Sequence, residues 1–233
     1  MGNYARAKVF TRLLNMLPLE SMKNILDLGC GYGEFTFMTA EKLTNANFTA
    51  LDIDTERLEK VEKTIQAFNI KNVKTFEGKI AELPVGKTFD LIFSVDVFEH
   101  ILEPYMPFND CYERLNKNGF LIVKMPNIHQ YSFLPQSTFK DHNKWLEDEH
   151  IGQVLDLKAL EKKFLDAGFS IYYKSYSDGF WSRIAWEIGY LSKQGGSFVQ
   201  LLFLPLCKFF ITIDQLLPNP QKGNAIQVIG QKL

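Results

Sequence analysis

The sequence predicts an α/β fold built on a mostly parallel sheet. Short apolar segments that suit strands alternate with amphipathic segments that suit helices along much of the 233 residues. This alternation favours parallel strands joined by right-handed helical crossovers. No internal repeat, low-complexity stretch or linker interrupts the pattern, so we expect a single domain over residues 1–233.

The expected elements follow one another from the N-terminus. An amphipathic helix is expected within residues 1–20, because Val9 and Leu13 recur at helical spacing and Pro18 ends the segment. Strands are then expected at 24–28, 47–53, 73–77, 89–95, 120–125, 169–176 and 225–230. The helices between them are expected at 34–43, 55–68, 105–115, 156–167, 179–193 and 198–217.

Charge and cysteine content exclude some classes of protein. A formal net charge of -1 gives no general attraction to phosphate backbones, which disfavours broad nucleic-acid binding. The three cysteines form no C-x-x-C pair, which suggests a reducing compartment and argues against a cysteine-based zinc site. Residues 1–17 lack the apolar core of a secretory signal, so we expect a cytoplasmic location.

The strongest local signal is a glycine-rich turn between a strand and a helix, in the segment ILDLGCGYGEF at residues 25–35. Its glycines permit positive φ and close approach of a ligand to the backbone, and the helix behind them offers free N–H groups. Asp52 ends the next strand, where a carboxylate can accept hydrogen bonds from both hydroxyls of a ribose. The spacing G-x-G-x-G differs from the dinucleotide fingerprint, and the nearby Asp27 would repel a pyrophosphate.

With these residues in view, the sequence resembles the class I S-adenosylmethionine-dependent methyltransferases. The resemblance rests on five segments in the same order: DLGCGYGEF, ALDID, FEGKIAELP, FDLIFSVDVFEHILEP and ERLNKNGFLIVKMPN. It covers about residues 20–130. It implies a Rossmann-like three-layer sandwich, with a seven-stranded, mostly parallel sheet whose last strand is antiparallel. It also implies S-adenosyl-L-methionine as the cofactor.

The resemblance also implies which residues bind the cofactor. Asp52 would bind the ribose hydroxyls, and Ile53 would pack on the adenine. Family members usually carry an acid after the glycine that follows the third strand, whereas Lys79 stands there in this sequence. Adenine would then be recognised by the backbone around Lys79, Ile80 and Ala81, or by Glu82. The remaining cofactor-binding candidates are Asp27, Gly29, Gly31, Gly33 and Ser94.

Chemistry is expected beyond the carboxyl ends of the fourth and fifth strands. His100 is the first candidate to deprotonate an acceptor, and His129 is the second. The stretch Asp96–His100 is similar to one in quinone-pathway O-methyltransferases, where a divalent metal is bound, so Asp96, Glu99 and His100 form an alternative metal site. The plain alternative is that Glu99 and His100 only cap or line the next helix. The segment 141–150 is either a charged surface loop or a substrate lid.

An apolar helical insertion is expected at 177–223, between the last two strands. Lys208, Asp214 and Pro205 argue against its second helix spanning a membrane, and Pro205 would break hydrogen bonds in mid-helix. Four roles stay open for the insertion: an aromatic cap over the acceptor, a homodimer interface, a peripheral membrane contact through 198–217, or plain packing on the core.

Together these features predict transfer of a methyl group from S-adenosylmethionine to a small-molecule or lipid-linked acceptor, with oxygen favoured as the acceptor atom. The fourth-strand motif lacks the N/D-P-P-Y/F pattern of adenine N-methyltransferases, so no nucleic-acid substrate is expected. Two alternatives are a metal-assisted quinone or isoprenoid O-methyltransferase and a protein that binds the cofactor without turnover.

Overall fold

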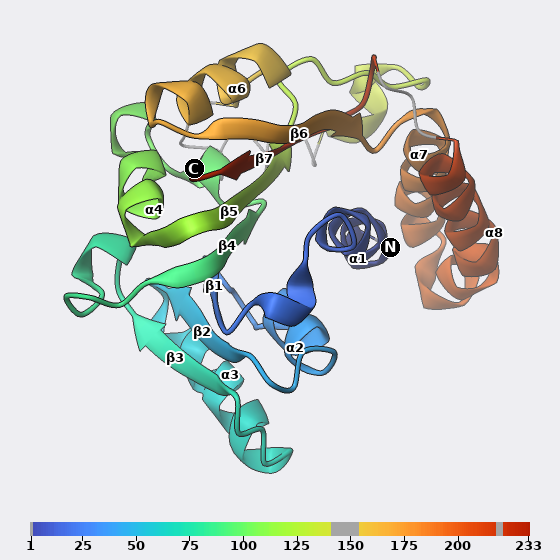
Figure 1. Cartoon of the computed structure of the whole chain (residues 1–233). Helices are drawn as coiled ribbons and strands as arrows, with labels where there is room; N and C mark the ends of the chain where they lie inside the picture. The colour runs from blue at the N-terminus through green and yellow to red at the C-terminus, as the bar shows by residue number, and fades with distance from the viewer. Residues whose placement is uncertain (1, 141–153, 218–220) are drawn as a thin grey trace.

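A seven-stranded sheet forms the centre of the protein in a computed structural model that describes residues 2–140, 154–217 and 221–233 (Figure 1). Its order is β3-β2-β1-β4-β5-β7-β6, and β7 runs antiparallel to both of its neighbours. This confirms the expected fold class. The strands are β1 (Asn24–Leu28), β2 (Asn47–Asp52), β3 (Val73–Glu77), β4 (Phe89–Val95), β5 (Leu115–Pro126), β6 (Ser170–Ser177) and β7 (Ala225–Gln231).

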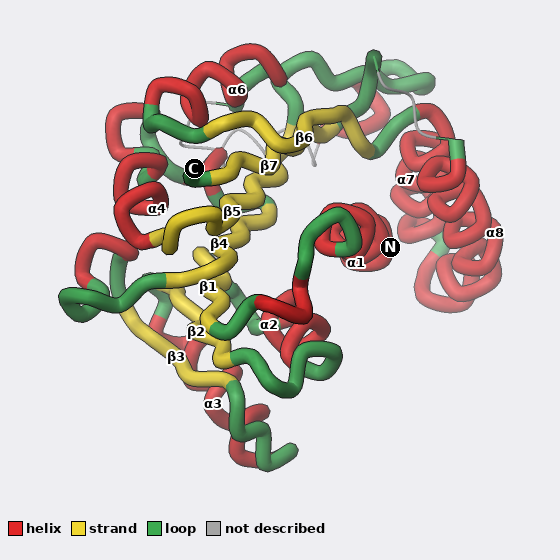
Figure 2. The backbone as a smooth tube through the Cα atoms, in the orientation of Figure 1, coloured by secondary structure: helices red, strands yellow, loops and turns green. Residues whose placement is uncertain are grey.

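Helices cover both faces of the sheet (Figure 2). One face packs against α1 (Gly2–Leu14), α2 (Glu34–Ala40) and α3 (Thr55–Ala67). The other face packs against α4 (Phe108–Arg114) and α6 (Leu157–Asp166). The central strands are buried on both faces and therefore read as continuous apolar runs, as parallel strands usually do.

The N-terminal helix α1 is part of the core. Its apolar stripe buries Val9, Phe10 and Leu13 completely, and the Phe10 ring contacts the rings of Phe35 and Phe93 at centroid distances of 5.1 and 4.7 Å. Aromatic pairs at such distances add to the gain from apolar burial. These contacts fix α1 against one face of the sheet, with Arg6 at the cavity described below.

Two further helices, α7 (Phe180–Gln194) and α8 (Gly196–Leu216), form a hairpin between β6 and β7 (Figure 1). Asp214 of α8 accepts hydrogen bonds from Gly179 N–H (2.9 Å), Trp181 N–H (3.1 Å) and the Ser182 hydroxyl (2.8 Å). This carboxylate satisfies N–H groups at the start of α7 that have no partner within the helix. The bonds also tie α8 to α7.

The largest difference from the sequence expectation lies around residues 105–120. The helix begins at Phe108, because Glu103–Tyr105 forms a separate 3-10 turn and Pro107 precedes the helix. The fifth strand begins at Leu115, and an irregularity in its pairing with β4 absorbs the residues up to Phe120. Asn118 takes the left-handed φ of +65° within this irregular stretch.

Pro205 lies inside the helix expected at 198–217 and removes one hydrogen bond there without ending the helix. The helix α8 is continuous from Gly196 to Leu216 with Pro205 inside it. Proline supplies no N–H to the carbonyl of Leu201 one turn earlier, but both residues are exposed, so that carbonyl is not sealed in an apolar core. In length and composition, α8 is the one helix in the described part of the chain that could cross a membrane.

Candidate active site

The glycine turn joins β1 to α2 through residues in left-handed conformations. Gly29, Gly31 and Gly33 have φ angles of +78°, +54° and +78°. A Cβ at Gly29 would lie 2.6 Å from the side chain of Val97, so the turn touches the segment that follows β4. A Cβ at Gly31 would meet no atom within 4 Å. The turn is thus packed closely on one side and open at Gly31, which leaves room for a ligand at its backbone.

Asp52 is held firmly at the carboxyl end of β2. Its Oδ2 accepts the N–H of Gly31 at 2.7 Å, and its Oδ1 accepts the N–H of Asp54 at 3.0 Å. Each carboxylate oxygen keeps a second lone pair, which could accept a ribose hydroxyl. The next side chain, Ile53, is 72% exposed and available to pack on a flat ring. Both predicted residues therefore lie beside the glycine turn.

Asp27 lies beneath the turn as a buried carboxyl group. The Thr36 hydroxyl donates to its Oδ2 at 2.5 Å. Burial, assisted by the negative charge of Asp52, raises the pKa of Asp27 to about 7 against the lowering effect of Thr36. This carboxyl group therefore changes charge near neutral pH, and a cationic ligand would favour its ionised form.

The other cofactor-binding candidates differ in exposure. The Lys79 N–H donates to Glu82 Oε2 at 2.8 Å, and this carboxylate also lies against Gly78. A carboxylate is thus present near the usual place of the family acid, as the Glu82 alternative requires. Ala81 is exposed, whereas the Ile80 side chain is buried in the core.

Ser94 does not present its side chain to a ligand. It is fully buried, and its hydroxyl donates to the carbonyl of Leu28 at 2.9 Å. This bond joins the ends of β4 and β1 directly before the glycine turn. The Ser94 side chain therefore positions the turn, and a cofactor contact through the rest of this residue stays a prediction.

A cavity of about 340 Å³ lies beyond the carboxyl ends of β4 and β5. Asp96, Glu99 and His100 line it from the segment after β4, and Lys124 lines it from β5. The opposite wall comes from α1, α7 and α8, through side chains that include Arg6, Ser182, Arg183, Trp186 and Ile211. Its volume is in the range of small-molecule sites, and Val97 connects its β4 wall to the glycine turn.

The charged groups of this cavity form a network around Lys124. Its Nζ lies 2.9 Å from Asp96 Oδ1 and 3.7 Å from Asp178 Oδ2, and Arg6 Nη1 lies 3.4 Å from Asp96 Oδ2. Burial lowers the pKa of Lys124, but the two carboxylates outweigh burial and raise it above its usual value. Burial also raises the pKa of Asp178, against the effect of Lys124, so the shorter contact with Asp96 carries the main ion pair. Asp96 and Asp178 have φ angles of +55° and +53°.

Glu99 is the residue whose importance the sequence did not reveal. Its side chain is 1% exposed, lines the cavity, and has an Oε2 atom without a hydrogen-bond partner. Burial raises its pKa to about 8, with a further contribution from the negative charge of Asp96. In the sequence Glu99 stood out only as a metal ligand or a helix cap. The available sequence signal was an acid that follows the apolar residues Val97 and Phe98 directly.

The alternative metal site does not assemble among the described residues. No group of three or more His, Cys, Asp or Glu side chains in 2–140, 154–217 and 221–233 could hold a metal ion. Asp96 instead binds Lys124 and Arg6, whose positive charges occupy its two oxygens.

The two histidine candidates separate in the structure. His100 lines the cavity and is exposed. His129 lies in the turn after β5, where its backbone N–H donates to Asn127 Oδ1 at 3.2 Å, and the neighbouring Gln130 lines the cavity in its place. The structure therefore brings His100 to the candidate site and leaves His129 outside it. The segment 141–150 lies outside the described residues.

The insertion contributes to the cavity with few aromatic groups. Among the aromatic side chains of α7 and α8, Trp186 of α7 lines the cavity, beside the polar Ser182 and Arg183. Phe198, Phe203 and Phe209 of α8 are exposed. The insertion therefore gives the cavity a mixed polar and apolar wall, and α8 directs much of its aromatic surface away from the cavity. Its role as a cap over the acceptor stays a prediction.

Comparison with known proteins identifies the family. Residues 19–168 match the family described as "Methyltransferase domain". The chain belongs to the S-adenosylmethionine-dependent methyltransferases. The resemblance found in the sequence and the cofactor that it implied are thereby confirmed.

The relatives include both N- and O-methyltransferases. The chain is 31% identical over 101 residues to (S)-coclaurine N-methyltransferase of Thalictrum flavum. This match covers 43% of this chain and 28% of that enzyme. It is 25% identical over 170 residues to malonyl-[acyl-carrier protein] O-methyltransferase of Halalkalibacterium halodurans, with 68% and 59% coverage. The matches thus span less than two thirds of these curated relatives.

The fold is shared with solved methyltransferases. A putative sarcosine dimethylglycine methyltransferase from Galdieria sulphuraria superposes with a TM-score of 0.67 at 17% identity, over 97% of this chain and 85% of that one. At this identity the likeness shows the fold alone.

The residues present fit the cofactor. The open backbone at Gly31, the fixed carboxylate of Asp52 and the exposed Ile53 suit a nucleoside, and the buried Asp27 suits the positive charge of the amino-acid end. When bound, S-adenosylmethionine supplies an electrophilic methyl group on a sulfonium.

Cofactor affinity is expected to depend on the charge of Asp27. The cationic cofactor binds the ionised carboxylate better, so its dissociation constant should fall as pH rises through about 7, by up to about tenfold per unit below that value. Calorimetry between about pH 5.5 and 7.5 measures this slope. Asp27→Asn should abolish it, whereas Glu34→Gln, a change of an exposed acid near the turn, should leave it intact. An equal slope in the Asp27→Asn variant contradicts this assignment.

Proposed function

We propose that this methyltransferase transfers the methyl group of S-adenosylmethionine to a hydroxyl oxygen of a small-molecule or lipid-linked acceptor. The observation that best supports this proposal is the unpartnered Oε2 of Glu99 in the wall of the cavity. A hydroxyl acceptor must lose a proton as it is methylated, whereas a carboxylate or a neutral amine needs no base before attack. A buried carboxylate with a pKa of about 8 is suited to take that proton near neutral pH.

The cavity residues would divide the work. Glu99 would accept the proton, and Lys124 would remain charged between Asp96 and Asp178 and hold the β4 and β5 walls in register. Trp186 and Ile211 would pack on the apolar part of the acceptor and exclude water. His100, at the same wall, is placed to receive the proton from Glu99 or to contact the acceptor. The role of His129 stays a prediction.

The cytoplasmic location is also a proposal. It is supported by the three cysteines, Cys30, Cys111 and Cys207, which are all free and buried. Free thiols are typical of reducing compartments.

A screen with methyl-labelled S-adenosylmethionine tests the function directly. We expect a labelled product when cell extracts are fractionated into small molecules and lipids, and no product with Asp52→Ala, which removes the acceptor for the Gly31 and Asp54 amides. Glu56→Ala, a change of an exposed acid in the first turn of α3, serves as the matched control. Label on nitrogen would identify an N-methyltransferase. Cofactor binding without any product would favour the non-catalytic alternative.

Replacing Glu99 should change both rate and pH dependence. Because the base must be ionised, kcat should rise with pH and level off above about 8. Glu99→Gln should lower kcat by about 100-fold or more, remove that rise and leave cofactor affinity unchanged. Steady-state kinetics across pH with the acceptor from the screen measures both effects.

Glu103→Gln is the control for that experiment, since Glu103 is a nearby exposed acid that pairs with Lys163 on the surface. If Glu99→Gln retains the full rate and the same profile, Glu99 is not the base. If His100→Gln removes the rise of kcat with pH and Glu99→Gln does not, His100 is the base.

A further inference from the structure

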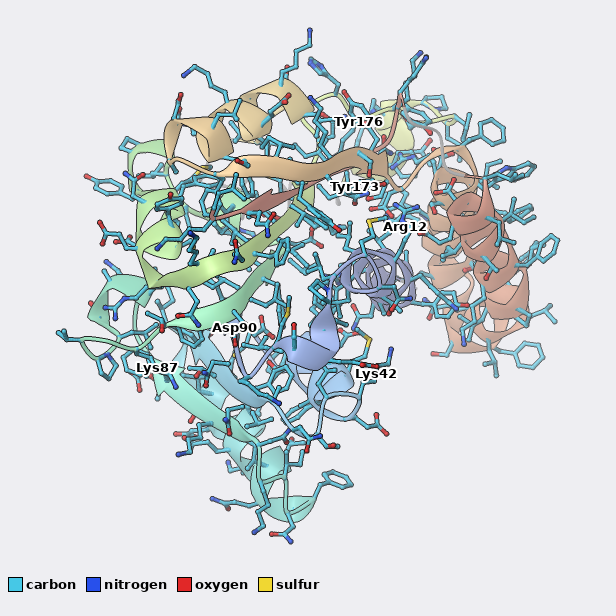
Figure 3. All side chains as sticks on the ribbon, in the orientation of Figure 1. Arg12, Lys42, Lys87, Asp90, Tyr173 and Tyr176 are labelled. Atoms are coloured by element: carbon cyan, nitrogen blue, oxygen red, sulfur yellow. The ribbon has the colours of Figure 1, made fainter. Side chains whose placement is uncertain are left out.

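The outer side of α8 is an exposed apolar face. Phe198, Leu202, Leu206 and Phe209 recur three to four residues apart and therefore share one side of the helix. Their exposed fractions are 80%, 68%, 40% and 59%. Side chains of α8 project from the edge of the molecule (Figure 3). Such a contiguous apolar face is unusual for the surface of a soluble protein and indicates a binding partner.

The opposite side of α8 belongs to the protein. Cys207 and Ile211 are buried against Ala185 of α7 and the start of α1. Asp214 is buried and bonded to the first turn of α7. A helix held along one side by these contacts cannot be surrounded by lipid, so α8 is suited to lie on an apolar surface and not to span it.

The charges around this face have one sign. Residues 179–233 contain two acids, Glu187 and Asp214, and both are buried and hydrogen-bonded within the protein. Residues 1–19 contain none. The basic side chains of these two segments include the exposed Lys8, Lys193 and Lys208. Although the net charge of the whole chain is near zero, the segments next to the apolar face carry an excess of basic residues, and the rest of the sequence carries an excess of acidic ones.

We propose that the outer face of α8 binds the surface of an anionic lipid bilayer, with α8 lying in the plane of the interface. Apolar side chains would enter the acyl region while the lysines meet anionic headgroups. A second copy of the chain is a poorer occupant, because a two-fold contact through this face would bring equal positive charges together. Since Ile211 on the inner side of α8 lines the cavity, binding would also place the cavity next to the bilayer.

Flotation with vesicles tests this proposal. The full chain should float with phosphatidylcholine vesicles that contain about one third phosphatidylglycerol, and much less with phosphatidylcholine alone. The double variant Leu202→Ser, Phe209→Ser should bind about 100-fold more weakly, since each removed side chain is worth about tenfold. Lys193→Glu should weaken binding to the anionic vesicles only.

Phe68→Ser is the matched control, because Phe68 is 77% exposed at the end of α3, far along the chain from α8, and should leave flotation unchanged. Circular dichroism of each variant checks that the helices are retained. The proposal is overturned if the folded wild-type chain does not float with the anionic vesicles, or if the double variant floats equally well. The proposal is also overturned if the wild-type chain does not bind vesicles but sediments as a dimer, and the double variant sediments as a monomer.

Discussion

The buried ammonium group of Lys124 connects the parts of the protein that meet at the cavity. It extends from β5 to Asp96 after β4 and to Asp178 before α7, and Asp96 in turn receives Arg6 from α1. A charge that is 3% exposed is tolerated only when it is paired and hydrogen-bonded, so these four groups must keep their places together. Asp96 and Asp178, the two carboxylates that contact Lys124, both have left-handed φ angles, which few residues other than glycine adopt.

This network also explains why several charged groups line the cavity in a protein so rich in phenylalanine. Many aromatic side chains fill the two core layers or face outward from α8, while charged groups and Trp186 line the space beyond β4 and β5. Glu99 lies in that space without a partner for Oε2, next to the negative charge of Asp96. Burial and, after it, the negative charge of Asp96 raise the pKa of Glu99 against the effect of Lys124 and Arg6, which makes Glu99 a weak acid, as a base that works near neutral pH must be.

Much of the fold could be predicted because it depends on local sequence. Strand β1 and its glycine turn are specified by adjacent residues. The position of Asp52 could be predicted because it ends the second strand of the same βαβ unit. The polar network could not be predicted, because Arg6, Lys124 and Asp178 are far apart in the chain and meet only in three dimensions. How little Pro205 disturbs α8 also could not be predicted, because this depends on exposure, which the sequence does not state.

Hydrogen exchange of a Lys124→Met variant tests the central role of this network most directly. Methionine keeps the side-chain length and removes the charge, which leaves Asp96 with Arg6 alone and Asp178 without its cation. Breaking a buried ion pair costs about 3–5 kcal/mol, so we expect amides in α1 and the first turn of α7 to exchange at least about tenfold faster. Amides in β1, β2 and β3 should keep their protection, because their contacts are apolar. Unchanged exchange in α1 and α7 would contradict the account.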